Sequence, residues 1–281
     1  MKPVILILFL FCAGHAALSQ KLSSDYTVVD YALIECVYKV SFKESKQIDE
    51  VKTEIMKLFI GENGISKFAS NRRFLAEDLV NTYTGELASS QLLVNEAVKL
   101  PKSVFKYIVY KDMGEKTLTF EERTGGHNYR YRENLDMLME WKILPGKETV
   151  NGYECQMATT FFAGRHYKAW FTMELPVPEG PYKFSGLPGL IVKVYDKQKD
   201  YVFELQHLKN LAPKVPILKR SDKVNITDLE KGEYNEVVKR HKKNFMQSFT
   251  NAGMDLPHIS EEQKKNYQRR LQLKDNPIEL F

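Results

Sequence analysis

The sequence contains few cysteines and, beyond its first 20 residues, no long hydrophobic run. A helix that spans a bilayer needs about 20 consecutive apolar residues, and no segment after Ala17 provides them. We therefore expect no transmembrane span in the remainder of the chain. Of the 3 cysteines, Cys36 and Cys155 lie beyond residue 20. They could pair as a disulfide in an oxidising compartment or remain two buried free thiols, because cysteine packs as a small hydrophobic residue.

Recognisable catalytic motifs are also missing. The sequence has no G-x-S-x-G elbow, no glycine-rich phosphate loop and no Cys/His catalytic signature. No histidine stands at a metal-ligand spacing from another His or Cys. His127 with Met137, Met139 and Met157 would suit copper chemically, but methionines on strands more commonly pack a core. We expect no catalytic residue that a pattern can name, no metal site and no cofactor.

Charge of neither sign dominates. The 41 Lys and Arg residues face 36 Asp and Glu residues, which leaves a net charge of +5. This mild excess supports a weak preference for acidic surfaces, and nucleic acid is not an expected partner. Hydrophobic residues at 43% and aromatic residues at 12% suffice for a sizeable core. The length fits one large or two small domains.

The amino terminus has the three-part pattern of a secretory signal peptide. Met1-Lys2 is a short positive start, Val4–Phe11 is wholly apolar, and Cys12–Ala17 continues with mostly small residues. Cleavage is best placed after Ser19. We therefore expect a signal peptide at 1–19, a single exported domain at 20–281, and a final location in the periplasm, at the cell surface or in the medium.

Short alternating segments with turn signals between them predict a mainly antiparallel sheet, because parallel strands need longer crossovers. In the first segment Ala32, Ile34, Cys36, Tyr38, Val40 and Phe42 share one face, and in the seventh Met137, Met139, Trp141 and Ile143 do. One-sided apolar patterning favours a sheet with one covered face and one available face. The predicted strands are Val28–Phe42, Val51–Ile60, Ile65–Ser70, Val104–Lys111, Lys116–Arg123, His127–Glu133, Asp136–Leu144, Tyr153–Ala163, His166–Met173, Gly189–Asp196 and Tyr201–Leu208.

Helices are predicted in two places. Arg72–Leu100 is rich in helix formers, with a break expected at Gly85 or at Ser89-Ser90. The carboxy-terminal part, about 227–274, is the second helical region. It carries capping boxes at Thr227–Glu230 and Ser260–Gln263, and follows a predicted linker at Pro213–Pro216. The apolar stripe of its first helix is Tyr234, Val237, Val238, His241, Phe245 and Phe249. The predicted fold is therefore α+β, with a curved meander sheet at about 28–208.

The hexapeptide Gly186-Leu-Pro-Gly-Leu-Ile191 is the most informative stretch. Pro188 and Gly189 suit the two central positions of a type II turn, in which glycine accepts a positive φ. Aromatic residues on both sides of this loop could line an apolar cleft, or they could plug the end of the sheet. The candidate binding residues are Trp170, Tyr182, Phe184 and Leu187.

Several stretches together resemble the GLPGLI family of exported proteins from Bacteroidetes. They are Ser66–Ser70, Gly152–Ala158, Ala163–Thr172, Gly180–Ile191 and Asn276–Leu280. The resemblance implies a cell-envelope or secreted location and no assigned activity, so it transfers no catalytic residue. The strand pattern is also loosely similar to periplasmic lipoprotein carriers, which cup lipid in a half-open antiparallel sheet; this likeness concerns the fold alone.

Two interpretations of function remain. The first is a non-enzymatic envelope protein whose concave sheet binds an apolar ligand such as a lipid, a peptide or a partner protein. The second is an envelope enzyme of an uncharacterised kind that uses carboxylates with His127 or His166. A cleft that holds titratable groups of displaced pKa would favour the enzyme.

Overall fold

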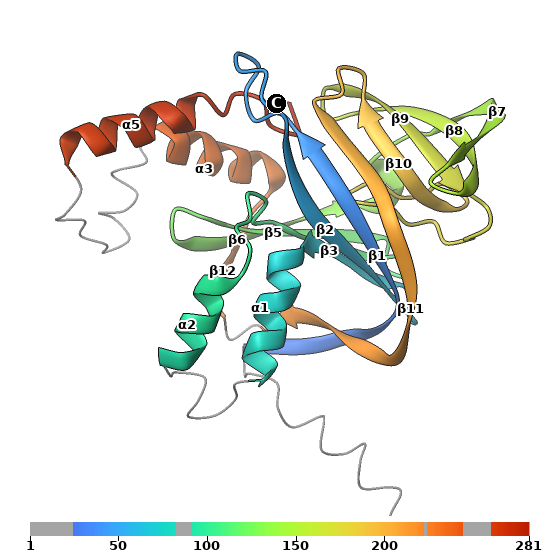
Figure 1. Ribbon diagram of the computed structural model, residues 1–281, viewed down its shortest axis with the longest axis horizontal. Helices are drawn as coiled ribbons and strands as arrows, with labels where there is room; N and C mark the ends of the chain where they lie inside the picture. Colours follow the sequence, from blue (N-terminus) through green and yellow to red (C-terminus); the bar gives the residue numbers. More distant parts are fainter. Residues whose placement is uncertain (1–24, 83–90, 222–223, 244–259, 281) are drawn as a thin grey trace, which may run out of the picture.

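The structure, a computed structural model, describes residues 25–82, 91–221, 224–243 and 260–280. A sheet of twelve strands makes up most of the described chain (Figure 1). The strands are β1 (Tyr26–Phe42), β2 (Lys52–Gly61), β3 (Ile65–Ser70), β4 (Ile108–Asp112), β5 (Thr117–Thr124), β6 (His127–Asn134), β7 (Lys142–Val150), β8 (Tyr153–Phe162), β9 (Arg165–Thr172), β10 (Leu190–Asp196), β11 (Tyr201–Arg220) and β12 (Ile226–Asp228).

The order across the sheet is β12-β6-β5-β4-β3-β2-β1-β11-β10-β9-β8-β7. Neighbouring strands are antiparallel, apart from β12, which pairs with β6 in parallel. Two meanders, β1 to β6 and β7 to β11, meet where β1 pairs with β11. The prediction of a mainly antiparallel meander with helices is confirmed.

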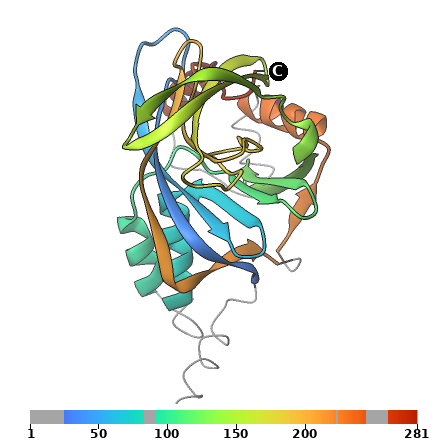
Figure 2. The same ribbon diagram turned by 90° about the vertical axis from the view of Figure 1, so that its right-hand side faces the viewer.

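The sheet curls because a short segment of the chain connects β6 and β7, which lie near opposite edges of the sheet. β6 and β7 are ten strand spacings apart, which would be about 48 Å in a flat sheet. Only residues 135–141 connect them, and eight Cα steps span at most about 29 Å. The edges must therefore bend toward each other, and Figure 2 shows the resulting half-open barrel.

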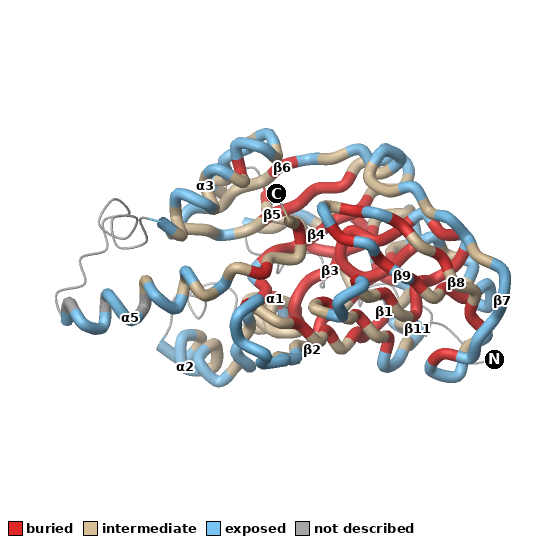
Figure 3. Tube along the Cα trace, turned by 90° about the horizontal axis from the view of Figure 1, so that it is seen from above, coloured by how far each residue is buried: buried red, intermediate tan, exposed pale blue. Residues whose placement is uncertain are grey.

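Helices lie outside the curl and at one end of it. The helices are α1 (Asn71–Thr82), α2 (Gln91–Lys99), α3 (Lys231–Lys243) and α5 (Glu261–Gln272). α1 packs on β2 and β3, and α3 packs on β6 and α5. Buried residues concentrate in the strands, whereas α2 and α5 are largely exposed (Figure 3). Among the described helices, none has the length and apolar character needed to cross a bilayer.

The two faces of the sheet carry separate apolar clusters. The larger cluster lies on the concave face and includes residues of both meanders. The smaller cluster lies on the convex face under α1 and consists of Ala32, Phe59, Ala69, Phe74, Ile108, Tyr110 and Ile217. Ala32 is therefore not on the same face as Cys36, contrary to prediction. A register irregularity between Ala32 and Ile34 shifts the alternation.

Buried charges accompany the convex cluster. The Lys67 ammonium lies 2.6 Å from a carboxylate oxygen of Glu77 in α1 and also donates to the Leu218 carbonyl at 2.9 Å. Glu121, on the same face, is 1% exposed, and neither of its carboxylate oxygens accepts a hydrogen bond from the described residues. Burial raises the pKa of Glu121, although the cations of Arg220 and Lys219 act in the opposite direction.

This carboxyl gives a pH-dependent prediction. Because its folded pKa is raised, ionised Glu121 destabilises the native state at neutral pH, and this loss disappears as the pH falls through that pKa. We expect Glu121→Gln to raise the unfolding free energy at pH 7.5 by about 1–3 kcal/mol, the usual cost of an unsatisfied buried group. The gain should shrink toward pH 4. Urea unfolding at several pH values measures it, with exposed Glu148→Gln as the control; a gain independent of pH would contradict the prediction.

The predicted strand Asp136–Leu144 is wrong. Leu135–Met137 is a turn of 3₁₀ helix, which begins where the Asn134 side chain accepts a hydrogen bond from the Asp136 N–H. β7 starts only at Lys142 and continues through Pro145, which lies beyond the predicted end of the strand at Leu144. A proline is tolerated there because β7 is an edge strand. Met137, Met139, Trp141 and Ile143 therefore do not share a strand face.

The predicted linker Pro213–Pro216 is also wrong, since β11 runs through it to Arg220. Beyond Glu204 this strand pairs, among the described residues, only with β1. Its prolines therefore lie on an unpaired edge or in the irregular stretch opposite Ala32. The sheet core thus extends past residue 208. Thr227 lies in β12, not in a capping box, and α3 begins at Lys231.

Other predicted helical features are confirmed. The Ser260–Gln263 capping box is formed, and the 72–100 segment holds two helices, α1 and α2. The signal peptide at 1–19, the break at Gly85 or Ser89-Ser90, and the stripe residues Phe245 and Phe249 lie outside the described residues.

Candidate functional site

The loop of residues 174–189, between β9 and β10, enters the concave side of the sheet (Figure 2). Its Phe184 is fully buried and lies against the rings of Tyr167 and Phe203, with centroid distances of 4.8 and 5.9 Å. Backbone hydrogen bonds within the loop, such as Gly186 N–H to the Pro178 carbonyl at 3.0 Å, fix its path. The loop therefore fills much of the half-open barrel.

The glycines of the hexapeptide have different roles from those predicted. Gly186 has the positive φ, +88°, whereas Gly189 does not. A Cβ on Gly189 would lie 2.0 Å from the Thr172 carbonyl oxygen. Gly189 is needed because β10 begins against the end of β9 with no room for a side chain, so the type II turn with a positive φ at Gly189 is not formed.

The four candidate binding residues do not lie together on an open surface. Tyr182, Phe184 and Leu187 are 2%, 0% and 1% exposed and belong to the concave cluster. Trp170 is half-buried on β9 and packs against the same cluster. Tyr182 alone among the four lines a cavity that opens at the end of the barrel.

That cavity, of about 260 Å³, lies between the sheet, α3 and the C-terminal tail (residues 275–280). Its wall is mostly aromatic, and its polar residues carry both signs of charge. The rings that line it are Phe42, Phe105, Tyr107, Phe120, Tyr131, Tyr182, Tyr201 and Tyr234. The charged residues are Glu44, Glu122, Glu279, Lys242 and Lys274.

The pKa values of the two deeper carboxyls of the cavity, Glu122 and Glu279, are displaced in opposite directions. Burial raises the pKa of Glu122, although the carboxylate accepts a hydrogen bond from the Tyr234 hydroxyl. Burial would also raise the pKa of Glu279, but the ammonium groups of Lys183 and Lys231, at 2.7 and 2.8 Å, outweigh it and hold this pKa below its usual range. One cavity thus contains a carboxyl that favours its neutral form and another that favours its charged form.

Buried lysines hold the 174–189 loop in place from inside. Lys183 is fully buried, and its ammonium ion-pairs with Glu279 and Glu133. The same ammonium lies over the ring of Tyr131, 4.9 Å from the centroid. Lys111 of β4 ion-pairs with Glu179 at 2.6 Å and donates to the Gly180 carbonyl at 2.7 Å. These contacts link the loop to β4, β6 and the C-terminal tail.

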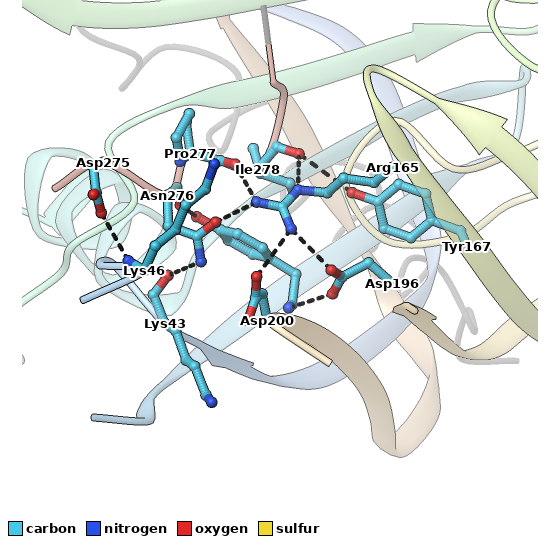
Figure 4. A network of polar contacts seen from close by, with 11 residues as sticks. Lys43, Lys46, Arg165, Tyr167, Asp196, Asp200, Asp275, Asn276, Pro277 and Ile278 are labelled. Carbon is cyan, nitrogen blue, oxygen red and sulfur yellow. Dashed lines mark hydrogen bonds and ion pairs between the residues drawn. The ribbon is translucent and has the colours of Figure 1, made fainter. Parts of the chain in front are cut away.

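The tail is held by Arg165 at the start of β9 (Figure 4). The guanidinium donates to the Asn276 side chain at 2.6 Å and to the Pro277 and Ile278 carbonyls at 2.8 and 3.1 Å. On its other side it ion-pairs with Asp196 at 2.9 Å. The Tyr201 hydroxyl donates to the Asn276 carbonyl at 2.6 Å. The tail therefore closes one side of the aromatic cavity.

The two cysteines are buried free thiols, so the disulfide alternative is not formed. Cys36 lies on β1 and Cys155 on β8, with β11, β10 and β9 between them in the sheet. Burial raises the pKa of both thiols, that of Cys155 to about 11. Both are expected to stay protonated and unreactive near neutral pH.

The residues of the enzyme hypothesis are dispersed. His127 is exposed at the start of β6, and His166 lines a more polar hollow of about 510 Å³ beside Arg165. Within the described ranges, no group of three or more His, Cys, Asp or Glu side chains is placed to hold a metal ion. Glu122 and Glu279, two of the three carboxyls that share the aromatic cavity, are 157 positions apart by number, and no sequence signal joined them.

Sequence reasoning missed Arg165, Lys183 and Glu279. One signal was present: Arg165 alternates in phase with Tyr167, Ala169 and Phe171, which places it on the buried face of β9. A charged residue in a buried phase needs a partner. The identity of that partner, the C-terminal tail, depends on the closure of the barrel and leaves no local pattern.

Comparisons with known proteins give a partial family match and distant structural likenesses. The sequence model of a family described as "Protein of unknown function (Porph_ging)" matches residues 100–193. No curated protein matches the chain. Among solved structures, PNGF-II aligns at 15% identity and a TM-score of 0.46, over 75% of this chain and 34% of that one. The chain thus spans about a third of the length of PNGF-II.

Two further structures are similar at lower scores. MucB in complex with MucA(peri) aligns at 9% identity and a TM-score of 0.29, over 66% of this chain and 52% of MucB. A LolA superfamily protein from Nitrosomonas europaea aligns at 8% identity and a TM-score of 0.27, over 75% of this chain and 96% of that protein.

Proposed function

We propose that this protein is an exported, non-enzymatic binding protein of the cell envelope, related to the GLPGLI proteins. Its ligand is apolar, either a lipid or an apolar segment of a peptide or partner protein, and is held in the aromatic cavity between the sheet, α3 and the C-terminal tail. The observation that carries the proposal is this cavity, whose wall is built mainly from aromatic rings and which opens at the end of the half-open barrel.

The position of the predicted binding residues supports a modified form of the earlier hypothesis. Tyr182 contributes directly to the wall. Phe184 and Leu187 pack behind it in the concave cluster, against which Trp170 also packs. In this arrangement the 174–189 loop forms part of the wall of the binding site. Because the loop fills much of the half-open barrel, the ligand occupies the smaller cavity at the end of the barrel.

The test is to fill the cavity with a larger side chain. Val238 of α3 lines the cavity, whereas Val237 is half-buried on the same helix and is not part of the wall. Protein purified from its own envelope should carry an apolar ligand visible by native mass spectrometry. We expect Val238→Phe to reduce ligand occupancy about tenfold or more, since overpacking a site costs about 1–3 kcal/mol, and Val237→Phe to retain the ligand.

Circular dichroism should confirm that both variants remain folded. Preparations of the natural protein that are repeatedly empty would contradict the proposal. So would equal occupancy in Val238→Phe and the natural protein, because the ligand would then lie elsewhere.

An enzyme that uses Glu122 as a general acid is the second candidate. It is favoured by one observation: Glu122 and Glu279 share a cavity and their pKa values are displaced in opposite directions. Incubation of the purified protein with an envelope extract, followed by mass spectrometry, tests it. A product that forms with the natural protein and is lost in Glu122→Gln would support catalysis; identical product profiles would exclude this role for Glu122.

A further inference from the structure

The carboxyls and the lysines that line the aromatic cavity differ in whether they have partners within the protein. Glu44 ion-pairs with Lys274 and Lys52, both at 2.5 Å. Glu279 ion-pairs with Lys183 and Lys231. Glu122 accepts the Tyr234 hydroxyl, and burial raises its pKa toward the neutral form. Each carboxyl of the wall therefore already has a partner inside the protein.

Lys242 differs from these groups. Its ammonium donates to the Lys274 carbonyl at 3.2 Å, and within the described part of the chain it forms no ion pair. Burial and the neighbouring Lys274 lower the pKa of Lys242, and the carboxylates of Glu122 and Asp275, which act in the opposite direction, do not offset this. By contrast, Lys239 on the same helix is exposed and pairs with Glu236 at 2.9 Å.

The aromatic rings lie deep in the cavity, whereas its lysines lie nearer the surface. The rings of Phe42, Tyr182 and Tyr201 are at most 4% exposed, whereas Lys242 is half-buried and Lys274 is exposed. The cavity thus has a mainly aromatic interior. At its rim Lys274 is paired with Glu44, whereas Lys242 has no ion pair within the described residues. A ligand that fits both parts has an apolar chain and a negatively charged head.

We infer that the ligand is an anionic single-chain amphiphile, with its chain among the aromatic rings and its acidic head at the Lys242 ammonium. The inference rests on the proposed binding function and specifies the ligand class. A carboxylate or phosphate head would accept charge-assisted hydrogen bonds from Lys242, which are stronger than those between neutral groups. A neutral or cationic head would leave the ammonium without an anion.

The experiment compares three decyl compounds: decanoate, decan-1-ol and decyltrimethylammonium. Their binding to the exported protein is measured by calorimetry at pH 7.5. We expect decanoate to bind at least about tenfold more tightly than the other two. Lys242→Gln should weaken decanoate about tenfold and leave decan-1-ol unchanged, while Lys239→Gln, with the same loss of charge, should change neither.

The outcomes separate this inference from the proposed function. If decan-1-ol binds as tightly as decanoate, or if Lys242→Gln does not weaken decanoate selectively, the acidic-head inference is wrong and apolar binding stands. If no decyl compound binds while Val238→Phe still displaces a ligand carried from the envelope, the acidic-head inference is wrong and the proposed binding function is retained. If neither experiment detects a ligand, both proposals are wrong.

Discussion

The Gly189→Ala variant should lose about 3 kcal/mol or more of unfolding free energy, at or above the upper end of the usual overpacking cost. The added Cβ would stand 2.0 Å from the oxygen and 2.7 Å from the carbon of the Thr172 carbonyl. Both contacts are with backbone, so no side-chain rotation relieves them. Relief requires β10 to move from β9 at the Leu190–Thr172 pair, where both residues are fully buried.

Two other glycines provide matched controls for this substitution. A Cβ on Gly186 would have no atom of the described residues within 4 Å, but the residue has a φ of +88°. Gly186→Ala should therefore cost only about 1–2 kcal/mol of backbone strain. Gly232, in α3, has no close neighbour in the described part of the chain and no positive φ, so Gly232→Ala should be neutral or slightly stabilising.

Chemical denaturation of the three variants measures these differences. The expected order of stability is Gly232→Ala, then Gly186→Ala, then Gly189→Ala. If Gly189→Ala unfolds at the same denaturant concentration as Gly186→Ala, then the close approach to Thr172 does not limit residue 189. The role of the hexapeptide would then have to come from conformation alone.

The strands with regular alternation could be predicted closely from the sequence. β3 matches its predicted bounds, and β8, β9 and β10 agree within about two residues, a normal uncertainty for strand ends. The failures have local physical causes. Pro145 and Pro213 are turn signals by composition, yet both lie in strands where an unpaired edge or an irregular register tolerates proline.

The site was less predictable than the fold. Tyr182 was found because an aromatic residue beside a Pro/Gly loop is a recognisable pattern. The cavity also needs α3, the tail and the buried ion pairs, and these contacts join residues about 100 positions apart, such as Lys183 with Glu279 and Arg165 with Asn276. No short motif encodes such pairs. They appear only when the sheet has curled and its ends have been closed.

The Arg165→Gln variant should lose about 3–5 kcal/mol, the usual cost of removing one partner of a buried ion pair. Its guanidinium is 3% exposed and Asp196 is fully buried, so the substitution leaves a carboxylate without its cation. Three acceptors of the tail, at Asn276, Pro277 and Ile278, lose the guanidinium donor at the same time, although the Ile278 carbonyl keeps the Tyr167 hydroxyl. Stability and attachment of the tail should therefore fall together.

The Arg165→Lys variant separates the charge from the geometry. Lysine keeps the positive charge near Asp196 but has no planar fork that can reach the carboxylate and the tail at once. We expect an intermediate loss of about 2 kcal/mol and early release of the tail, read as faster digestion of residues 275–280 by carboxypeptidase under native conditions. Arg132→Gln is the surface control, since Arg132 is half-exposed and pairs with Asp228 at 3.1 Å; its loss should stay below about 1 kcal/mol. If Arg165→Gln unfolds within that range and its tail resists digestion as in the natural protein, Arg165 does not fasten the tail. The cavity beside it would then have to be closed by the contacts of Glu279 with Lys183 and Lys231.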